Sequence, residues 1–355
     1  MSKITLTNCY QCGNTGDVAI WSNIMREISK AIPKCEFTLL SQAVCDWDMN
    51  QLKEFNPKCL VGNIQGFSSE FIQSQDIFIS QGGGYMIGND MANSLQFYAK
   101  CQKLGKTVLF APQTFVGEIS HGTKSLLQEV LNKSPLVCAR EPETFEWLKN
   151  NGINNIRLFP DQVFRIEFKN KSTIDYPVKI AFRGYNKSDE ELKMIALLTD
   201  MIIETIGPVM FLAVGVGGND GFRSDFVALD RLKRFLRHKD QVFISETKLN
   251  AQGIALQLQT GILISDRYHA IVYAISNCCP FIPISPDIDH KMNGLTNRAN
   301  YIMDTVDWNI DLFNKVKFIW KNQKILRDRL NKVLPSIKSD VAEFYKLLIE
   351  TIKNV

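Results

Sequence analysis

Short apolar runs alternate with longer stretches of helical periodicity through most of the chain. The runs at residues 4–8 and 76–80 are rich in apolar and β-branched residues, and each is followed by a stretch such as 18–32 whose apolar positions repeat every three to four residues. Apolar strands that alternate with helices are typical of a parallel sheet covered on both faces. The same pattern predicts strands over 36–40, 107–111 and 136–139, and helices over 94–104 and 124–132.

A second series of the same kind follows a polar, Pro-terminated stretch at residues 169–177, which has the composition of a linker. We therefore predict an α/β chain of two domains, residues 1–168 and 169–310, with a helical segment over 311–355 that Pro335 should break or kink. Ligands bind at the carboxyl ends of parallel strands, so we expect a cleft where those ends meet. The strands of the second domain are expected over 178–182, 209–214, 242–245, 262–265 and 281–284, and helices over 190–206 and 226–237.

Composition limits the class of protein. The 355 residues are 45% hydrophobic and 22% charged, which is a globular balance and long enough for two cores. No apolar run approaches the ~18 residues of a membrane-spanning helix, and the start has too short an apolar run for a signal peptide. Nine cysteines without such a peptide favour a reduced, cytoplasmic setting. Cys9 and Cys12 have no second pair at ligand spacing, so we expect no metal and no cofactor.

The net charge of +4 is too small to indicate nucleic-acid binding. Residues 311–355 hold ten Lys or Arg and five Asp or Glu, a balance of +5, so the rest of the chain is near −1. A basic segment of this kind could touch anionic lipid at the inner membrane leaflet or an acidic glycan. A solvated helix face is the more ordinary interpretation of the same pattern.

Four polar or glycine-rich segments follow strands of the first domain. Asn14 and Asp17 lie in the loop between the first strand and the first helix, where Asp17 either caps the helix or serves as a base for a sugar hydroxyl. Gly83 and Gly84 follow the strand at 76–80, as an anion-binding nest or a crowded turn. Arg140 either binds an anion or pairs with Glu141 or Glu143. Asp161 is either a helix cap or a cleft carboxylate.

The densest group of functional side chains is in the second domain. Arg267 and His269 occupy one short turn after the strand at 262–265, and Arg183 ends the strand at 178–182. A guanidinium binds carboxylate or phosphate, and an imidazole exchanges protons near neutral pH. Lys291 adds a further positive group. The alternatives are a buried His269 bonded to backbone, a structural ion pair for Arg267, and an exposed loop lysine.

These segments occur in an order that resembles the polysaccharide pyruvyl transferase family over residues 8–295. The resemblance lies in Gly13-Asn-Thr-Gly-Asp17, Gly82-Gly-Gly84, Ala139-Arg-Glu141, Ser265-Asp-Arg-Tyr-His-Ala270 and Ser285-Pro-Asp-Ile-Asp-His-Lys291. It implies two Rossmann-like domains facing each other across a cleft, as in GT-B glycosyltransferases, with the acceptor on the N-terminal side. It also implies that Arg183, Arg267 and His269 surround phosphoenolpyruvate, joined by Lys291. Asp266 and Tyr268 occupy positions that vary in the family.

The implied reaction moves a pyruvyl group from phosphoenolpyruvate to two hydroxyls of a sugar in a surface polysaccharide or its lipid-linked precursor. The product is a cyclic ketal, and neither metal nor nucleotide is required. His269 is the expected proton donor, and Asp17 or Asp161 the expected base. Two other functions stay open: a GT-B-type glycosyltransferase that uses a sugar nucleotide, and a glycan-binding relative without turnover. If the acceptor is lipid-linked, the basic segment would hold the protein at the inner leaflet.

Overall fold

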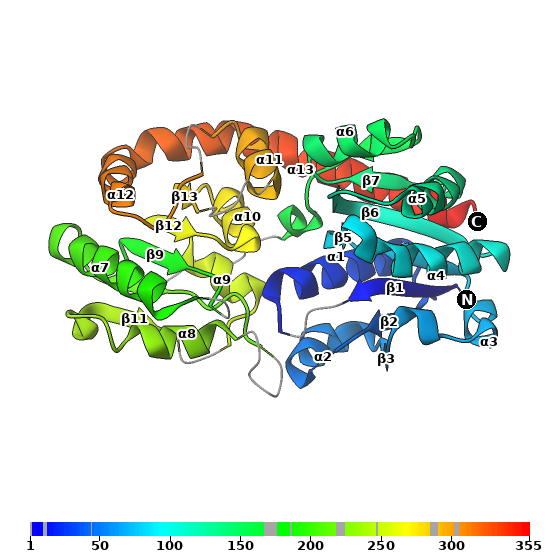
Figure 1. Cartoon of the computed structure of the whole chain (residues 1–355), viewed down its shortest axis with the longest axis horizontal. Helices are drawn as coiled ribbons and strands as arrows, with labels where there is room; N and C mark the ends of the chain where they lie inside the picture. The colour runs from blue at the N-terminus through cyan, green and yellow to red at the C-terminus, as the bar shows by residue number, and fades with distance from the viewer. Residues whose placement is uncertain are drawn as a thin grey trace. The chain divides into compact units, whose positions relative to one another are not determined.

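The computed structural model describes residues 2–9, 13–43, 45–166, 176–184, 187–217, 224–245, 248–284, 290–301 and 305–355. The chain forms two compact units. The first comprises Met1–Cys12, Asp17–Arg165 and Lys338–Val355, and the second comprises Gly13–Gly16 and Ile166–Ile337. Each unit has an α/β architecture with its own parallel sheet (Figure 1).

In the described part of the chain, the first unit holds a sheet of eight parallel strands in the order β3-β2-β1-β4-β6-β7-β8, with β5 paired to β6. In its centre, Ile4 of β1 lies between Phe37 of β2 and Ile77 of β4. The strands are β1 (Lys3–Cys9), β2 (Glu36–Ser41), β3 (Lys58–Val61), β4 (Ile77–Ser80), β5 (Gly83–Ile87), β6 (Thr107–Val116), β7 (Val137–Ala139) and β8 (Ile156–Leu158).

Helices cover this sheet, and serine side chains cap some of them. Ser120 precedes α5, and its hydroxyl accepts the N–H of Thr123 at 3.2 Å, which satisfies one of the unpaired donors of the first turn. The apolar faces bury rings such as Tyr98, which packs edge-on against Phe110 with centroids 5.2 Å apart. The helices are α1 (Thr15–Ala31), α2 (Asp46–Leu52), α3 (Ser69–Gln73), α4 (Met91–Lys103), α5 (His121–Lys133) and α6 (Pro142–Asn150).

The second unit is built on the parallel order β11-β10-β9-β12-β13, in which Ile180 of β9 lies between Phe211 and Ile264. Helices accompany the strands in alternation (Figure 1). The strands are β9 (Val178–Ala181), β10 (Val209–Phe211), β11 (Val242–Ile244), β12 (Ile262–Ser265) and β13 (Phe281–Pro283). The helices are α7 (Asp189–Thr205), α8 (Asp225–Leu232), α9 (Ala251–Gln257), α10 (Tyr268–Ser276), α11 (His290–Arg298), α12 (Asp311–Lys321) and α13 (Gln323–Lys353).

Both sheets reverse their order next to their first strand. The chain proceeds outward from β1 through β2 to β3 and then returns to place β4 on the other side of β1, and β9 has the same relation to β10, β11 and β12. This is the doubly wound arrangement, in which a crevice forms at the carboxyl ends of the strands on either side of the reversal. The prediction of two Rossmann-like α/β domains is confirmed. Arg183 and Arg267 follow the two strands at the reversal of the second sheet.

Some local predictions differ from the structure. The sequence predicts an anion-binding nest or a crowded turn at Gly83 and Gly84, but these residues begin β5, where Gly83 pairs with Gln113 of β6. Helix α13 continues through Pro335 rather than breaking there. One proline removes a single backbone hydrogen bond, and the buried residues Leu330 and Val341 hold the helix on either side of it. The chain divides after Arg165, a few residues before the predicted boundary, and Lys338–Val355 belongs to the first unit.

Candidate functional site

Arg267 is held by a buried carboxylate. It is the residue before α10, and its Nε lies 3.1 Å from Oδ2 of Asp225 while its Nη2 donates to Oδ1 of the same side chain. The side chain of Asp225 is 1% exposed and that of Arg267 is 11% exposed. This is the ion pair that the sequence left as an alternative. Among the described residues, Nη1 of Arg267 has no protein partner, so one end of the fork can still bind an anion.

Asp225 also joins the loops that follow β9 and β10. Its Oδ2 accepts the backbone N–H groups of Val214 at 3.1 Å and Gly215 at 2.8 Å, and its Oδ1 accepts that of Gly184 at 3.1 Å. One carboxylate therefore fixes three segments at the carboxyl edge of the sheet. Sequence reasoning missed Asp225, because its only signal was an acidic residue in the first turn of a helix.

A second carboxylate links Arg183 to the same edge. The backbone N–H of Arg183 donates to Oδ1 of Asp266 at 2.6 Å, and Nζ of Lys187 lies 3.5 Å from Oδ2. Burial raises the pKa of Asp266 above its ordinary value, although the charges of Lys187, Arg267 and Arg183 act in the opposite direction. The side chain of Arg183 is exposed, and within the described ranges it forms no ion pair, so its guanidinium is available to a ligand.

His269 lies against the segment that follows β1. A Cβ atom on Gly16 would overlap the His269 imidazole, so the absence of a side chain at residue 16 makes room for the ring. Gly13–Gly16 belongs to the second unit through Thr15, whose N–H donates to the Val214 carbonyl at 3.2 Å, and through a β-bridge between Asn14 and Gly215. The glycine-rich loop predicted from the sequence thus contacts the His269 turn.

These contacts bring together three of the predicted residues, Asn14, Arg267 and His269. Asn14 forms a β-bridge with Gly215, the Gly215 N–H donates to Asp225, and Asp225 binds Arg267, which shares one turn with His269. The start of α10 adds the partial positive charge of a helix N-terminus. Guanidinium groups beside an imidazole can bind an anion and supply a proton to it. Lys291 is half-buried at the start of α11, and residues 285–289 of its loop lie outside the described residues.

In the first unit, Arg140 is engaged by carboxylates. Its side chain is 3% exposed, with Nε 2.6 Å from Glu141, Nη1 2.8 Å from Asp161 and Nη2 2.8 Å from the Thr114 hydroxyl. The structure thus favours the ion-pair alternative over substrate binding, although this pair is buried rather than at the surface. Asp161 also accepts the N–H of Val163 at 2.8 Å, which fits the capping alternative for that carboxylate.

Asp17 is 2% exposed in the first turn of α1 and interacts with Tyr85 of β5. Burial raises the pKa of the Tyr85 hydroxyl well above its ordinary value, and the nearby charge of Asp17 and a hydrogen bond to it raise this pKa further. The close approach of Tyr85 to Gly83 shows why residue 83 has no side chain. Sequence reasoning missed Tyr85, because nothing in the sequence joins β5 to the loop after β1. Gly84 is half-buried beside it.

In the part of the chain that the structure describes, no group of three or more His, Cys, Asp or Glu side chains is placed to hold a metal ion. No described helix combines the length and the apolar character needed to cross a bilayer.

Solved structures share this fold at low sequence identity. A putative UDP-N-acetylglucosamine 2-epimerase from Listeria monocytogenes matches with a TM-score of 0.68 and 11% identity, covering 96% of this chain and 94% of its own. A glycosyltransferase from Rickettsia africae matches at 0.62 and 13%, covering 100% and 99%. Acinetobacter baumannii MurG matches at 0.53 and 12%, covering 100% of both chains. These neighbours establish a GT-B-like fold of two Rossmann-like domains and nothing about activity.

No curated protein matches the sequence. The family model for polysaccharide pyruvyl transferase, however, matches residues 14–288, a span that runs from Asn14 past the Arg267–His269 turn. It covers well over half of the chain and nearly all the segments whose geometry is described above. The chain therefore belongs to the polysaccharide pyruvyl transferase family.

Proposed function

We propose that this protein transfers the pyruvyl group of phosphoenolpyruvate to two hydroxyls of a sugar, forming a cyclic ketal and releasing phosphate. The observation that carries the proposal is the turn at Arg267 and His269, which the family match includes and which follows β12 at the reversal of the second sheet. A ligand that binds at this edge meets a guanidinium and an imidazole from the same few residues.

The charges of the site suit phosphoenolpyruvate, which carries a carboxylate and a phosphate. Arg183 has an exposed guanidinium, and Arg267 keeps Nη1 for a ligand while Asp225 holds its other edge. Lys291 is a third candidate, on the strength of the family resemblance. A fixed guanidinium stabilises charge on a departing phosphate without reorganising during the reaction.

His269 is the proposed acid. Protonation of C3 of phosphoenolpyruvate makes C2 electrophilic, one sugar hydroxyl adds to C2, the bond from C2 to the phosphate oxygen breaks, and the second hydroxyl closes the ketal. Of the two hydroxyl protons, one balances the proton gained at C3 and the other leaves with phosphate. Asp17 and Asp161 are the candidate bases; Asp161 binds Arg140 and the N–H of Val163, and Asp17 interacts with Tyr85.

The test is sugar-dependent phosphate release from phosphoenolpyruvate with a panel of hexosides, with the ketal product detected by mass. His269→Ala should lower turnover by about 10²–10⁴-fold, the usual loss when a general acid is removed. His121→Ala is the matched control, because His121 is exposed on α5 of the first unit. Near-normal turnover of His269→Ala would remove this residue as the acid.

The alternative function is glycosyl transfer from a sugar nucleotide. It is supported by the solved structures of similar fold, which include glycosyltransferases. Thermal shift separates the two functions, since a ligand that binds the folded state raises the melting temperature. Stabilisation by phosphoenolpyruvate and not by nucleoside diphosphates supports pyruvyl transfer. A glycan that binds without phosphate release would support the non-catalytic alternative.

The proposal of pyruvyl transfer also includes a lipid-linked acceptor, a cytoplasmic location and contact of residues 311–355 with the inner leaflet.

A further inference from the structure

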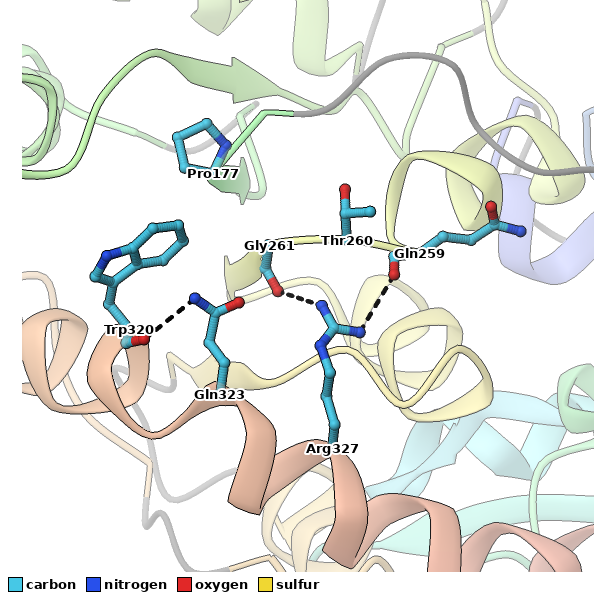
Figure 2. Close-up of a pocket in the computed structure, with 7 residues that line it drawn as sticks. All are labelled: Pro177, Gln259, Thr260, Gly261, Trp320, Gln323 and Arg327. Carbon is cyan, nitrogen blue, oxygen red and sulfur yellow. Dashed lines mark hydrogen bonds between the residues drawn. The ribbon is translucent and has the colours of Figure 1, made fainter.

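A pocket of about 520 Å³ lies at the amino-terminal edge of the second sheet (Figure 2). Its lining comes from the residues before β9 and β12 and from helices α12 and α13: Pro177, Gln259, Thr260, Gly261, Trp320, Gln323 and Arg327. Arg183, Arg267 and His269 follow the opposite, carboxyl ends of the same two strands. Each strand has four residues, so about 13 Å of strand separates the two edges. The pocket is therefore distinct from the candidate active site.

Backbone carbonyls fix the guanidinium of Arg327 in this pocket. Its Nη1 donates to the carbonyls of Gln259 at 3.2 Å and Cys278 at 3.4 Å, and its Nη2 donates to that of Gly261 at 2.9 Å. These bonds use three of the five N–H groups of an arginine. In the described ranges no carboxylate pairs with Arg327, so its full charge and two donors remain for a ligand.

The floor of the pocket is held in place by its own contacts. Gly261 has φ of +63°, and a Cβ there would overlap the Pro177 carbonyl, so the close approach of the two segments requires glycine. Nζ of Lys179, a residue with no exposed surface, donates to the carbonyl and hydroxyl of Thr260 at 2.8 and 3.1 Å. A pocket with a fixed floor binds ligand at a smaller entropic cost than one that must order itself.

The remaining lining combines an aromatic ring with carboxamides. Figure 2 shows Trp320 and Gln323 extending from α12 and α13 toward Pro177 and the segment at Gly261. Nε2 of Gln323 donates to the Trp320 carbonyl at 3.1 Å, which fixes the carboxamide beside the indole. A sugar ring offers C–H groups to an indole face and hydroxyls to carboxamides. The lining holds one arginine and no acidic residue, so an anionic ligand is favoured.

We propose that this pocket is a second saccharide site, which binds a sugar that carries a carboxylate. The identity of that sugar as a pyruvylated one rests on the proposed function, because the ketal formed there bears one carboxylate. Trp320 stacks on the sugar ring, Gln323 binds hydroxyls, and the remaining N–H groups of Arg327 bind the carboxylate. A pocket of this volume holds one or two sugar units. It would retain an already modified part of the polymer on the protein.

The experiment is a calorimetric titration, without phosphoenolpyruvate, with a pyruvylated methyl hexoside and with the same hexoside lacking the ketal. We expect the pyruvylated sugar to bind more tightly, Trp320→Ala to weaken its binding at least about tenfold, and Arg327→Gln to remove the preference for the acid. Arg329→Ala, an exposed arginine of the same helix, is the control and should change neither value. Trp320→Ala carries the test if Arg327→Gln fails to fold, since Arg327 also binds backbone.

The proposal is overturned if neither sugar binds, if binding of the pyruvylated sugar is unchanged by Trp320→Ala, or if the two sugars bind equally. Binding of a nucleoside diphosphate that depends on Trp320, without binding of the acidic sugar, would assign the pocket to a nucleotide instead. His269→Ala should bind the pyruvylated sugar normally. If the unmodified protein binds the pyruvylated sugar but releases no phosphate from phosphoenolpyruvate, the proposed function alone is contradicted. If it releases phosphate but does not bind that sugar through Trp320, this site alone is contradicted.

Discussion

Asp225 illustrates how a residue that touches no substrate can set up a site. Its carboxylate holds Nε and Nη2 of Arg267 and accepts three backbone N–H groups. Asp225→Asn keeps the shape of the side chain but removes its negative charge. The amide nitrogen of asparagine is itself a donor, so it would face either the guanidinium or a backbone N–H without forming a hydrogen bond. Hydrogen bonds to charged groups contribute about 1.5–3 kcal/mol. We therefore expect kcat/KM for phosphoenolpyruvate to fall about 10- to 100-fold, mainly through KM, as measured by phosphate release.

The control for this variant is Asp230→Asn on the same helix, since Asp230 is exposed and its ion pair among the described residues is with Lys233 at 3.6 Å. It should leave the kinetic constants unchanged. A purely structural role for Asp225 predicts a different result, in which the folded fraction falls while KM of the remaining enzyme stays normal. Circular dichroism and active-site titration together separate the two outcomes.

Gly16 is the second residue whose role depends on a contact rather than on its own chemistry. The methyl group of Gly16→Ala would overlap the His269 imidazole, so the ring must leave its position. Alanine favours the helical backbone by about 0.5–1 kcal/mol, so the fold should persist. We expect turnover to fall toward that of His269→Ala, with an unchanged melting temperature or a higher one.

Gly122→Ala provides the comparison, because a Cβ at that position in α5 meets only the Ser120 hydroxyl at 4.0 Å. It should gain helix stability and keep full turnover. Full turnover of Gly16→Ala would show that the imidazole position is not required and would count against His269 as the proton donor.

Secondary-structure elements follow the hydrophobic pattern where both of their faces are buried. The central strands β1, β4, β9 and β12 are nearly all buried, and the sequence predicts each of them. The strands that it misses are β3, which is exposed at both ends, and β5, which begins with two glycines. An apolar run in the sequence is therefore the clearest signal for a strand that is buried on both faces.

The candidate site, like the strands, can be predicted from the sequence only in part. Arg267 and His269 share one turn, and Arg183 ends a predicted strand, so local sequence places all three at the carboxyl edge. Asp225 and Gly16 come from segments far away in the chain, and no periodicity joins them to that turn. The charge of a residue predicts its role less well than its position does, because a guanidinium that follows a strand can bind either a ligand or a buried carboxylate. Both Arg140 and Arg267 bind buried carboxylates in the structure.

At the scale of the whole molecule, the division into two units follows from the linker composition, but the assignment of the C-terminal helix does not. An amphipathic helix offers the same 3.6-residue pattern to any apolar surface, so the sequence cannot tell which core it completes. Helix α13 serves both units, since residues up to Ile337 belong to the second and Lys338–Val355 to the first. Phe344, which is fully buried, packs on Phe159 of the first unit with ring centroids 5.8 Å apart.

Phe344→Ala should therefore destabilise the first unit although the residue lies near the end of the chain. Removing a buried phenylalanine costs about 3–5 kcal/mol, because the apolar contacts are lost and a cavity remains. Hydrogen exchange should show weaker protection in β1 and β6, with little change in β9 and β12. Lys346→Ala, at an exposed position of the same helix, should leave protection unchanged in both units. If protection fell in β9 and β12 instead, the end of α13 would belong to the second core, and the two-unit division argued here would be wrong.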